Sequence, residues 1–224
     1  MVKKAAASTR VTSPGRPTTP RGRKAAEVTR TPSYVRRRES LIGLAIDVFS
    51  RHGYVGGTTT EIADLAGLTQ PALYHYVGGK GAFLEEICER VGSRLRGAME
   101  SVLSSNVGPG ERLRDFIHAY AEVVLAEQAA FRIYVTEASH LPKAARDKLR
   151  AEERWYQDKL TALVQAAIES GELATTVPPL LVGQVLMGAL SWAYRWRRGE
   201  VTATDIADGV VELISLTPRS SGKV

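Results

Sequence analysis

The sequence predicts an all-α fold. Apolar residues recur every three or four positions through most of the chain, and glycine or proline follows most of these periodic segments. No run alternates between apolar and polar residues as a half-buried strand would. The length of 224 residues suits one or two domains, and an apolar content of 44% is enough for a sizeable core.

The first 33 residues differ from the rest of the chain in charge and composition. They hold eight Lys or Arg and one Glu, a net charge of +7, which leaves −1 for the remainder because the whole chain carries +6. Four prolines, many small polar residues and no aromatic residue predict that residues 1–33 form a disordered basic tail. Such a tail is attracted to DNA phosphates whatever their sequence, or it serves only as a solubilising extension.

Residues 34–80 predict three short helices. From Leu41 the first helix has apolar residues at i, i+3, i+4, i+7 and i+8, and Gly53 is expected to end it. Thr58 and Glu61 have the spacing of a capping box at the start of the second helix. Together with the glycine turn that follows, this order predicts a helix-turn-helix, whose second helix enters the major groove of DNA.

The third helix, Gln70 to Val77, is expected to bury Leu73 and Val77 and to expose the opposite face. There Gln70 has the groups that bond adenine, and Pro71 and Ala72 are able to touch a thymine methyl group. A three-helix core without any DNA-binding role is the alternative. Two tyrosines and a histidine on an exposed helix favour DNA binding, because the fold itself does not require them there.

The segment Arg38–Ile87 carries a specific pattern of residue types. Its members are Ala45, Phe49, Gly53, Tyr54, Thr58, Thr59, Ile62, Ala63, Ala66, Gly67, Thr69, Leu73, Tyr74, Tyr76 and Lys80. With them the segment resembles the DNA-binding domain of the tetracycline-repressor (TetR) family of bacterial transcription regulators. This resemblance implies a homodimer that binds double-stranded DNA at a palindromic operator and responds to a small-molecule effector.

The resemblance also implies roles for individual side chains. Residues expected to face bases are Gln70, Pro71, Ala72 and His75. Residues expected to contact the DNA backbone are Thr58, Thr59, Thr69, Tyr74, Tyr76 and Lys80. Two departures from the family pattern, Val77 in place of Phe and Gly78–Gly81 in place of Ser-Lys-Glu, are expected to loosen the hinge before the fourth helix.

Residues 81–217 predict a helical regulatory and dimerisation domain, followed by a flexible C-terminus at residues 218–224. With the first three, about nine helices are expected in the chain. The later ones are predicted at Ala82–Leu103, Leu113–Glu127, Ala129–Ser139, Pro142–Ser170, Pro179 to about Arg198, and from Thr204 onward.

The helix that starts at Pro179 is nearly all apolar and rich in small residues. A helix of this kind is buried on several sides, either within its own subunit or in a four-helix bundle between two subunits. The resemblance favours the bundle, and a two-fold interface suits a palindrome. The expected interface residues are Gly183, Met187, Gly188, Ser191, Arg195, Ile206, Val210 and Leu213.

Seven aromatic residues of the second domain are candidates for the lining of a ligand pocket. They are Phe116, Tyr120, Phe131, Tyr134, Trp155, Tyr156 and Trp192. Singly such residues are more often plain core, but as a group they suit a large apolar pocket between helices.

A second, looser resemblance concerns one branch of the family. The segment from Phe131 and Arg132 to Pro142, and the Trp-x-Tyr-x-Trp near the C-terminal end, are similar to regulators of fatty-acid and steroid catabolism that release DNA on binding an acyl-CoA. Arg195, Arg197 and Arg198 are then candidates for the coenzyme-A phosphates. The alternative is a solvated helix C-terminus, where cations are favourable in any case.

Catalysis is not predicted. The four histidines lack metal-ligand spacing, and Cys88 lies beside three glutamates, which would raise its thiol pKa. The sequence therefore predicts no enzyme, no metal and no cofactor apart from an effector. Without a signal peptide or a spanning segment, a cytoplasmic protein is expected. The alternative function is a sequence-indifferent DNA-organising protein that relies on the basic tail.

Overall fold

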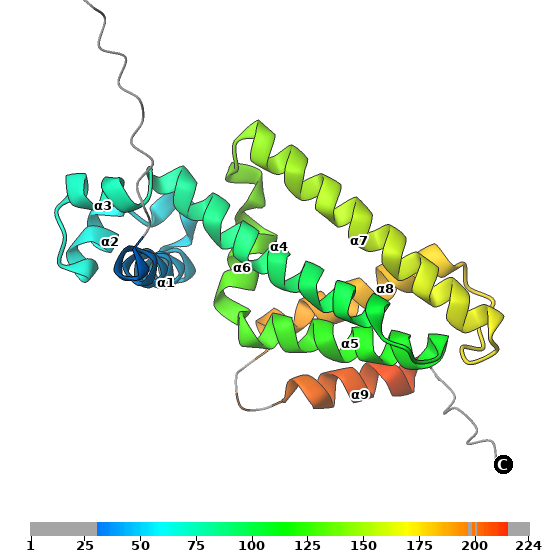
Figure 1. Cartoon of the computed structure of the whole chain (residues 1–224). Helices are drawn as coiled ribbons and strands as arrows, with labels where there is room; N and C mark the ends of the chain where they lie inside the picture. Colours follow the sequence, from blue (N-terminus) through cyan, green and yellow to red (C-terminus); the bar gives the residue numbers. More distant parts are fainter. Residues whose placement is uncertain (1–30, 197–198, 200, 215–224) are drawn as a thin grey trace, which may run out of the picture.

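The computed structural model describes residues 31–196, 199 and 201–214, and every regular element among them is helical (Figure 1). The all-α prediction is confirmed, with nine α-helices and two short 3₁₀ turns in this part of the chain. Most of the predicted basic tail, Arg197, Arg198 and the predicted flexible C-terminus lie outside the described residues.

The first helix is longer than predicted. α1 spans Pro32–Gly56, with Thr31 as its N-cap and a proline in the first turn, where no backbone N–H is needed. Gly53, with φ of 68° and ψ of 168°, leaves the helical conformation and interrupts α1 where the sequence predicted its end, and a last turn continues to Gly56. The predicted apolar face of α1 is buried, so the helical period was identified correctly.

Two short helices follow and complete the reading domain, the name used below for α1–α3. α2 spans Thr59–Ala66 and α3 spans Gln70–Tyr76. The Thr58 hydroxyl accepts a hydrogen bond from the backbone N–H of Glu61, which confirms half of the predicted capping box. The Glu61 carboxylate instead lies 3.4 Å from Arg51 and 3.3 Å from His52 on α1.

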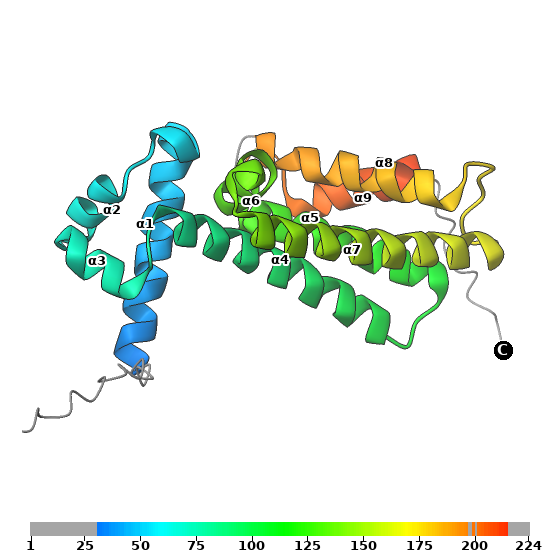
Figure 2. The same cartoon turned by 90° about the horizontal axis from the view of Figure 1, so that it is seen from above.

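The remaining helices form the body, an elongated bundle that α4 enters from the reading domain (Figures 1 and 2). In the body α5 contacts α4, α7, α8 and α9, while α6 contacts both α1 and α4. The elements are α4 Lys80–Ser104, α5 Pro109–Ala126, α6 Gln128–Glu137, the 3₁₀ turn η1 Ala138–His140, α7 Lys143–Glu169, α8 Pro179–Trp192, the 3₁₀ turn η2 Ala193–Arg195 and α9 Ala203–Leu213.

Two ion-pair groups attach α4 to its neighbours. Near the reading domain, the Arg38 guanidinium on α1 pairs with the Glu86 carboxylate on α4. At the corner between α5 and α6, Glu127 is only 9% exposed and receives Arg90 at 3.0 Å and Arg94 at 2.9 Å from α4. Charged hydrogen bonds to a buried carboxylate are strong and directional, so they fix α4 against this corner.

The prediction for α8 was wrong in length. The helix ends at Trp192, and a 3₁₀ turn leads to extended backbone at Trp196 instead of a helix to Arg198. The Gln128 side-chain amide on α6 donates to the backbone carbonyls of Tyr194 and Trp196, at 3.0 and 2.6 Å, and so holds this segment in its non-helical path. α9 begins with the capping box of Thr202 and Asp205, one residue before the predicted start.

Gly57 provides a test of the packing between α1 and α2. A Cβ atom there would lie 2.7 Å from Cδ1 of Phe49 and 3.0 Å from Cγ1 of Val48. We therefore expect Gly57→Ala to lower the free energy of unfolding by about 1–3 kcal/mol, the usual cost of overpacking.

Gly43, in the middle of α1, has no atom within 4 Å of its Cβ position. Gly43→Ala should raise that free energy by about 0.5–1 kcal/mol. Urea unfolding followed by circular dichroism measures both, and a destabilisation by both variants would contradict this packing.

Candidate nucleic-acid interface and ligand cavity

The outer face of α3 presents the side chains predicted to face bases. Leu73 and Val77 are buried on the inner side, as predicted. Gln70, Pro71 and His75 are exposed, and Ala72 is half-buried between them. Because the two buried residues fix the rotation of this short helix, its first turn is available to the edges of bases.

Two side-chain hydrogen bonds connect α3 to α2 on this face. The Gln70 amide donates to the Thr60 hydroxyl, and the hydroxyl groups of Thr59 and Tyr74 are 3.1 Å apart. Tyr74 remains exposed, so its hydroxyl is still accessible to a phosphate oxygen. These bonds connect α2 and α3 on the exposed face of the reading domain.

Four of the predicted backbone-contacting residues have a role within the fold. Thr58 and Thr69 are N-caps of α2 and α3. The Tyr76 ring stacks on Tyr34, with centroids 5.0 Å apart. The Lys80 ammonium donates to the Val55 carbonyl at 3.0 Å and lies 4.7 Å from the centre of the Tyr54 ring.

Sequence reasoning missed Tyr34. Its hydroxyl donates to the backbone carbonyls of His75 and Tyr76, at 3.4 and 3.3 Å, and so holds the end of α3. Tyr34 lies seven residues before Leu41 and therefore on the same face of α1, so the helical period was the signal that could have identified it.

A second contact connects the reading domain to the body at the kink of α1. The ring of Tyr54 lies 5.2 Å from the ring of His140, and His140 is 3.3 Å from the Glu137 carboxylate. A Cβ at Gly53 would lie 3.7 Å from the same carboxylate. The end of α6 and the 3₁₀ turn that follows it therefore pack directly against the kink of α1.

The body contains a cavity of about 380 Å³, called the inner cavity below. Four of the seven predicted aromatic residues line it, namely Tyr120, Phe131, Tyr134 and Tyr156. Helices α4 to α8 all contribute to its wall, including Leu95 of α4 and Met187 of α8. Its size and mostly apolar wall suit a small organic ligand.

The other three predicted aromatic residues lie outside the wall of the inner cavity. Phe116 is buried behind it, 5.8 Å from the ring centres of Tyr120 and Tyr156. Trp155 takes the Arg96 guanidinium over its ring at 3.9 Å. Trp192 is exposed and has the Arg195 guanidinium 4.5 Å from its ring centre.

The phenol groups of the inner cavity are held in their protonated form. Burial raises the pKa of Tyr120 to about 12 and also raises the pKa values of Tyr134 and Tyr156. Partial burial likewise raises the pKa of Glu153 in the same wall. The environment therefore disfavours negative charge inside the cavity.

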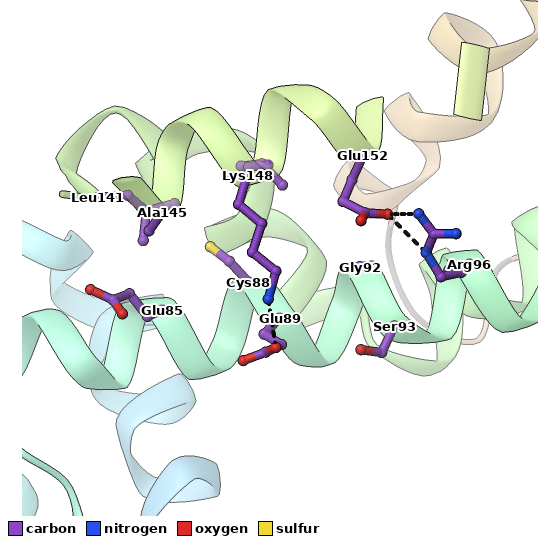
Figure 3. A pocket seen from close by; sticks show the side chains of 11 residues that line it. Glu85, Cys88, Glu89, Gly92, Ser93, Arg96, Leu141, Ala145, Lys148 and Glu152 are labelled. Carbon is purple, nitrogen blue, oxygen red and sulfur yellow. Dashed lines mark hydrogen bonds and ion pairs between the residues drawn. The ribbon is translucent and has the colours of Figure 1, made fainter. Parts of the chain in front are cut away.

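A second pocket of about 300 Å³, called the outer pocket below, lies between α4 and α7 (Figure 3). It shares Gly92, Arg96 and Glu152 with the inner cavity. Arg96 donates to Glu152 at 2.9 Å, and Lys148 donates to Glu89 at 2.9 Å across the pocket. Sequence reasoning missed this pocket, because charged residues on long helices usually mark a solvated face.

Cys88 also lines the outer pocket. Burial raises the pKa of its thiol to about 12, so the thiolate is not formed at neutral pH. The predicted direction of the shift is confirmed, while its cause is burial and not the neighbouring glutamates.

The residues predicted for a dimer interface are divided between two environments. Gly183 packs on Leu160 of the same subunit, 3.3 Å from its Cγ as measured at the Cβ position, and Ile206 is buried. Met187 and Ser191 line the inner cavity. Val210 is half-buried, whereas Gly188, Arg195 and Leu213 are exposed.

An exposed apolar stripe lies on α8 beside these residues. Leu181, Val185 and Trp192 are all exposed and share one face of the helix with Gly188. Val185 is 60% exposed, and Leu213 on the neighbouring α9 is 84% exposed. An apolar stripe of this length on a helix is typical of a protein–protein interface.

Two family models match the chain. Bacterial regulatory proteins of the tetR family match residues 41–87, and the tetracyclin repressor-like C-terminal domain matches residues 106–216. Within the part of the chain that the structure describes, none of the helices combines the length and apolar character needed to cross a membrane.

Relatives and solved structures agree with the family models. The HTH-type transcriptional repressor KstR2 of Rhodococcus jostii is 24% identical over 181 residues, which cover 80% of this chain and 89% of that relative. The regulator PfmR of Thermus thermophilus has a TM-score of 0.72 at 28% identity, over 78% of this chain and 96% of that one.

AibR, solved with isovaleryl coenzyme A and operator DNA, has a TM-score of 0.72 at 25% identity, over 81% of this chain and 100% of that one. The matched family and the relative KstR2 are transcription regulators and not enzymes. With a helix-turn-helix in its reading domain and a tetracycline-repressor-like body, the chain belongs to the tetR family of bacterial transcription regulators.

Proposed function

We propose that the protein is a repressor that binds a palindromic operator as a dimer and releases it when a small apolar effector enters the inner cavity. The observation that carries this proposal is the position of α4. Leu95 and Arg96 line the inner cavity, while Phe83 and Leu84 of the same helix are fully buried near the reading domain. A ligand that displaces α4 therefore changes the placement of α3.

DNA recognition in this proposal depends on the first turn of α3. Gln70 suits an adenine, Pro71 and Ala72 suit a thymine methyl group, and His75 donates to a base acceptor one turn later. Thr59 and Tyr74 supply hydroxyl groups for phosphate oxygens.

Dimerisation in this proposal uses the exposed stripe of α8 together with α9. Two such stripes related by a two-fold axis would bury Leu181, Val185 and Trp192 against their copies and remove apolar surface from water. The same axis would present two α3 helices to two half-sites. Gly188 in the stripe permits close approach, because it lacks a side chain.

An acyl-CoA is the effector class that we favour. AibR is a solved relative whose structure holds isovaleryl coenzyme A. Here the inner cavity would take the acyl group, and the outer pocket beside it offers Lys148 and Arg96 to phosphate groups. Both cations are paired with glutamates, so a phosphate has to displace Glu89 or Glu152. Arg195, one of the arginines predicted for this role, lies instead against Trp192.

Base recognition is tested by His75→Ala and Gln70→Ala. Each variant should lose about 1–3 kcal/mol of binding free energy at its preferred operator and change the preference at one base position, because a base-edge contact is removed. Binding-site selection from a random DNA pool, followed by fluorescence anisotropy at fixed salt, measures both effects.

Removal of residues 1–30 is the matched control, because it keeps the Thr31 cap of α1. This deletion should reduce the affinity for all DNA sequences by a similar factor and should reduce the salt dependence of binding. Loss of all sequence preference on removal of the tail, with His75→Ala silent, would favour the sequence-indifferent alternative.

Dimerisation is tested by Val185→Asp, which places a charge in the middle of the exposed stripe. We expect sedimentation velocity to show a monomer at micromolar concentration, since burying an unpaired charge is costly. Val55→Asp, at a valine that is 72% exposed in the reading domain, should remain a dimer. A dimer in both variants would contradict the α8 interface.

The effector proposal is tested with acyl-CoAs of two to twelve acyl carbons against the operator complex of the wild-type chain. At least one acyl-CoA should release the DNA. Met187→Trp, which fills part of the inner cavity, should still bind the operator but should no longer release it when the acyl-CoA is added. Free coenzyme A is the control and should have no effect. Release by free coenzyme A, or by none of the series, would contradict the acyl-CoA proposal.

A further inference from the structure

Two hydrogen-bonding groups in the wall of the inner cavity are left without a partner. Among the described residues, neither the Tyr156 hydroxyl nor the Gln157 side-chain nitrogen makes a hydrogen bond, although both atoms are buried. Tyr156 is 6% exposed, so bulk water does not complete its shell. Buried polar groups are nearly always paired, and an exception calls for a specific explanation.

Most of the other polar groups around the cavity are paired, although the Tyr134 hydroxyl in the same wall also makes no hydrogen bond among the described residues. The Tyr120 hydroxyl lies 2.8 Å from the Ser191 hydroxyl, and the Arg96 guanidinium is engaged by Glu152 and Glu100. The unpaired groups belong to neighbouring residues of α7 that both line the cavity, although the two atoms themselves are covered and are reached by a ligand only when a neighbouring side chain moves. A phenol hydroxyl can donate or accept a hydrogen bond, whereas an amide NH₂ only donates, so an acceptor is the one kind of partner that satisfies both groups.

The charge around the cavity decides which kind of acceptor fits. Glu152 and Glu153 both line it, and Arg96 is the one cation among its described lining residues. Arg96 is already neutralised, so an added carboxylate would meet two acidic side chains in a partly desolvated space. The surrounding wall, with Leu95, Phe131, Val135 and Met187, is apolar. A neutral oxygen on an apolar body satisfies both conditions.

We infer that the inner cavity recognises its ligand through a neutral carbonyl oxygen, which accepts a hydrogen bond from the Tyr156 hydroxyl with the Gln157 amide as the second donor. The inference rests on the proposed role of this cavity as the effector site. A ketone within the ligand and the carbonyl of an acyl thioester share this chemistry.

The experiment is titration calorimetry of the full-length chain with pairs of probes that differ only at the carbonyl group. One pair is 2-octanone and 2-methyl-1-octene, in which a methylene group replaces the oxygen. The other pair is S-ethyl hexanethioate and ethyl hexyl sulfide. The wild-type protein should bind the carbonyl member of at least one pair about tenfold more tightly, as expected for one net hydrogen bond. The pair that shows the preference identifies the source of the carbonyl.

Variants separate recognition from structure. Tyr156→Phe and Gln157→Leu should each reduce the carbonyl preference to within about twofold, whereas Tyr134→Phe in the same wall should retain it. The ligand-free Tyr156→Phe protein should unfold at the same temperature as the wild type or higher, because the variant removes a hydroxyl without a partner. If Tyr156 had only a structural role, Tyr156→Phe would lower the unfolding temperature and would reduce the affinity for both members of a pair equally.

Equal affinity for both members of each pair, no binding of either carbonyl probe, or tighter binding of octanoate than of 2-octanone would overturn the inference. Operator release is measured separately with the same probes. A carbonyl preference in binding without DNA release supports the inference and contradicts the effector role. Release by probes that lack a carbonyl leaves the effector role intact and contradicts the inference.

Discussion

One helix, α4, runs through a core that is continuous between the reading domain and the body, and the rest of the structure depends on this constraint. Its first turns bury Phe83, Leu84 and Ile87, and its later turns bury Val91, Leu95 and Met99. A helix with a continuous backbone ladder moves as a nearly rigid rod, so a displacement at one end is transmitted to the other. In the proposed mechanism, a ligand in the body therefore changes the position of α3 through α4.

The ion pairs of α4 restrict the form that this displacement takes. Glu127 holds Arg90 and Arg94 at the corner of α5 and α6, close to the middle of the helix. Arg38 and Glu86 hold its beginning against α1, while Arg96 reaches Glu152 on α7 beside both cavities. A ligand that disturbs the Arg96–Glu152 pair thus acts on α4 beyond its central anchor. The contact of His140 with Tyr54 gives α6 a second route to the reading domain.

Local chemistry made much of this architecture predictable. The caps at Thr58 and Thr69, the left-handed turn at Gly67 and the buried pair Leu73 and Val77 follow from rules that act over a few residues. What the sequence did not reveal depends on contacts between distant segments. Two contacts are of this kind. Lys80 binds the Val55 carbonyl and lies over the Tyr54 ring, and Gly183 is buried against Leu160. For α8, an apolar character on all sides concealed which residues face the cavity and which remain exposed.

The central claim is that occupancy of the inner cavity changes the placement of the two α3 helices in a dimer. The chain has a single cysteine, Cys88, which is buried, so one introduced cysteine carries a spin label selectively. Asp64→Cys puts that label on the exposed side of α2, which is tied to α3. Pulsed electron–electron double resonance then measures the distance between the two labels in the dimer, with and without the acyl-CoA that releases DNA. Our account predicts a narrow distribution whose mean shifts when that ligand is bound. An unchanged distribution at a ligand concentration that saturates the protein by calorimetry would contradict it.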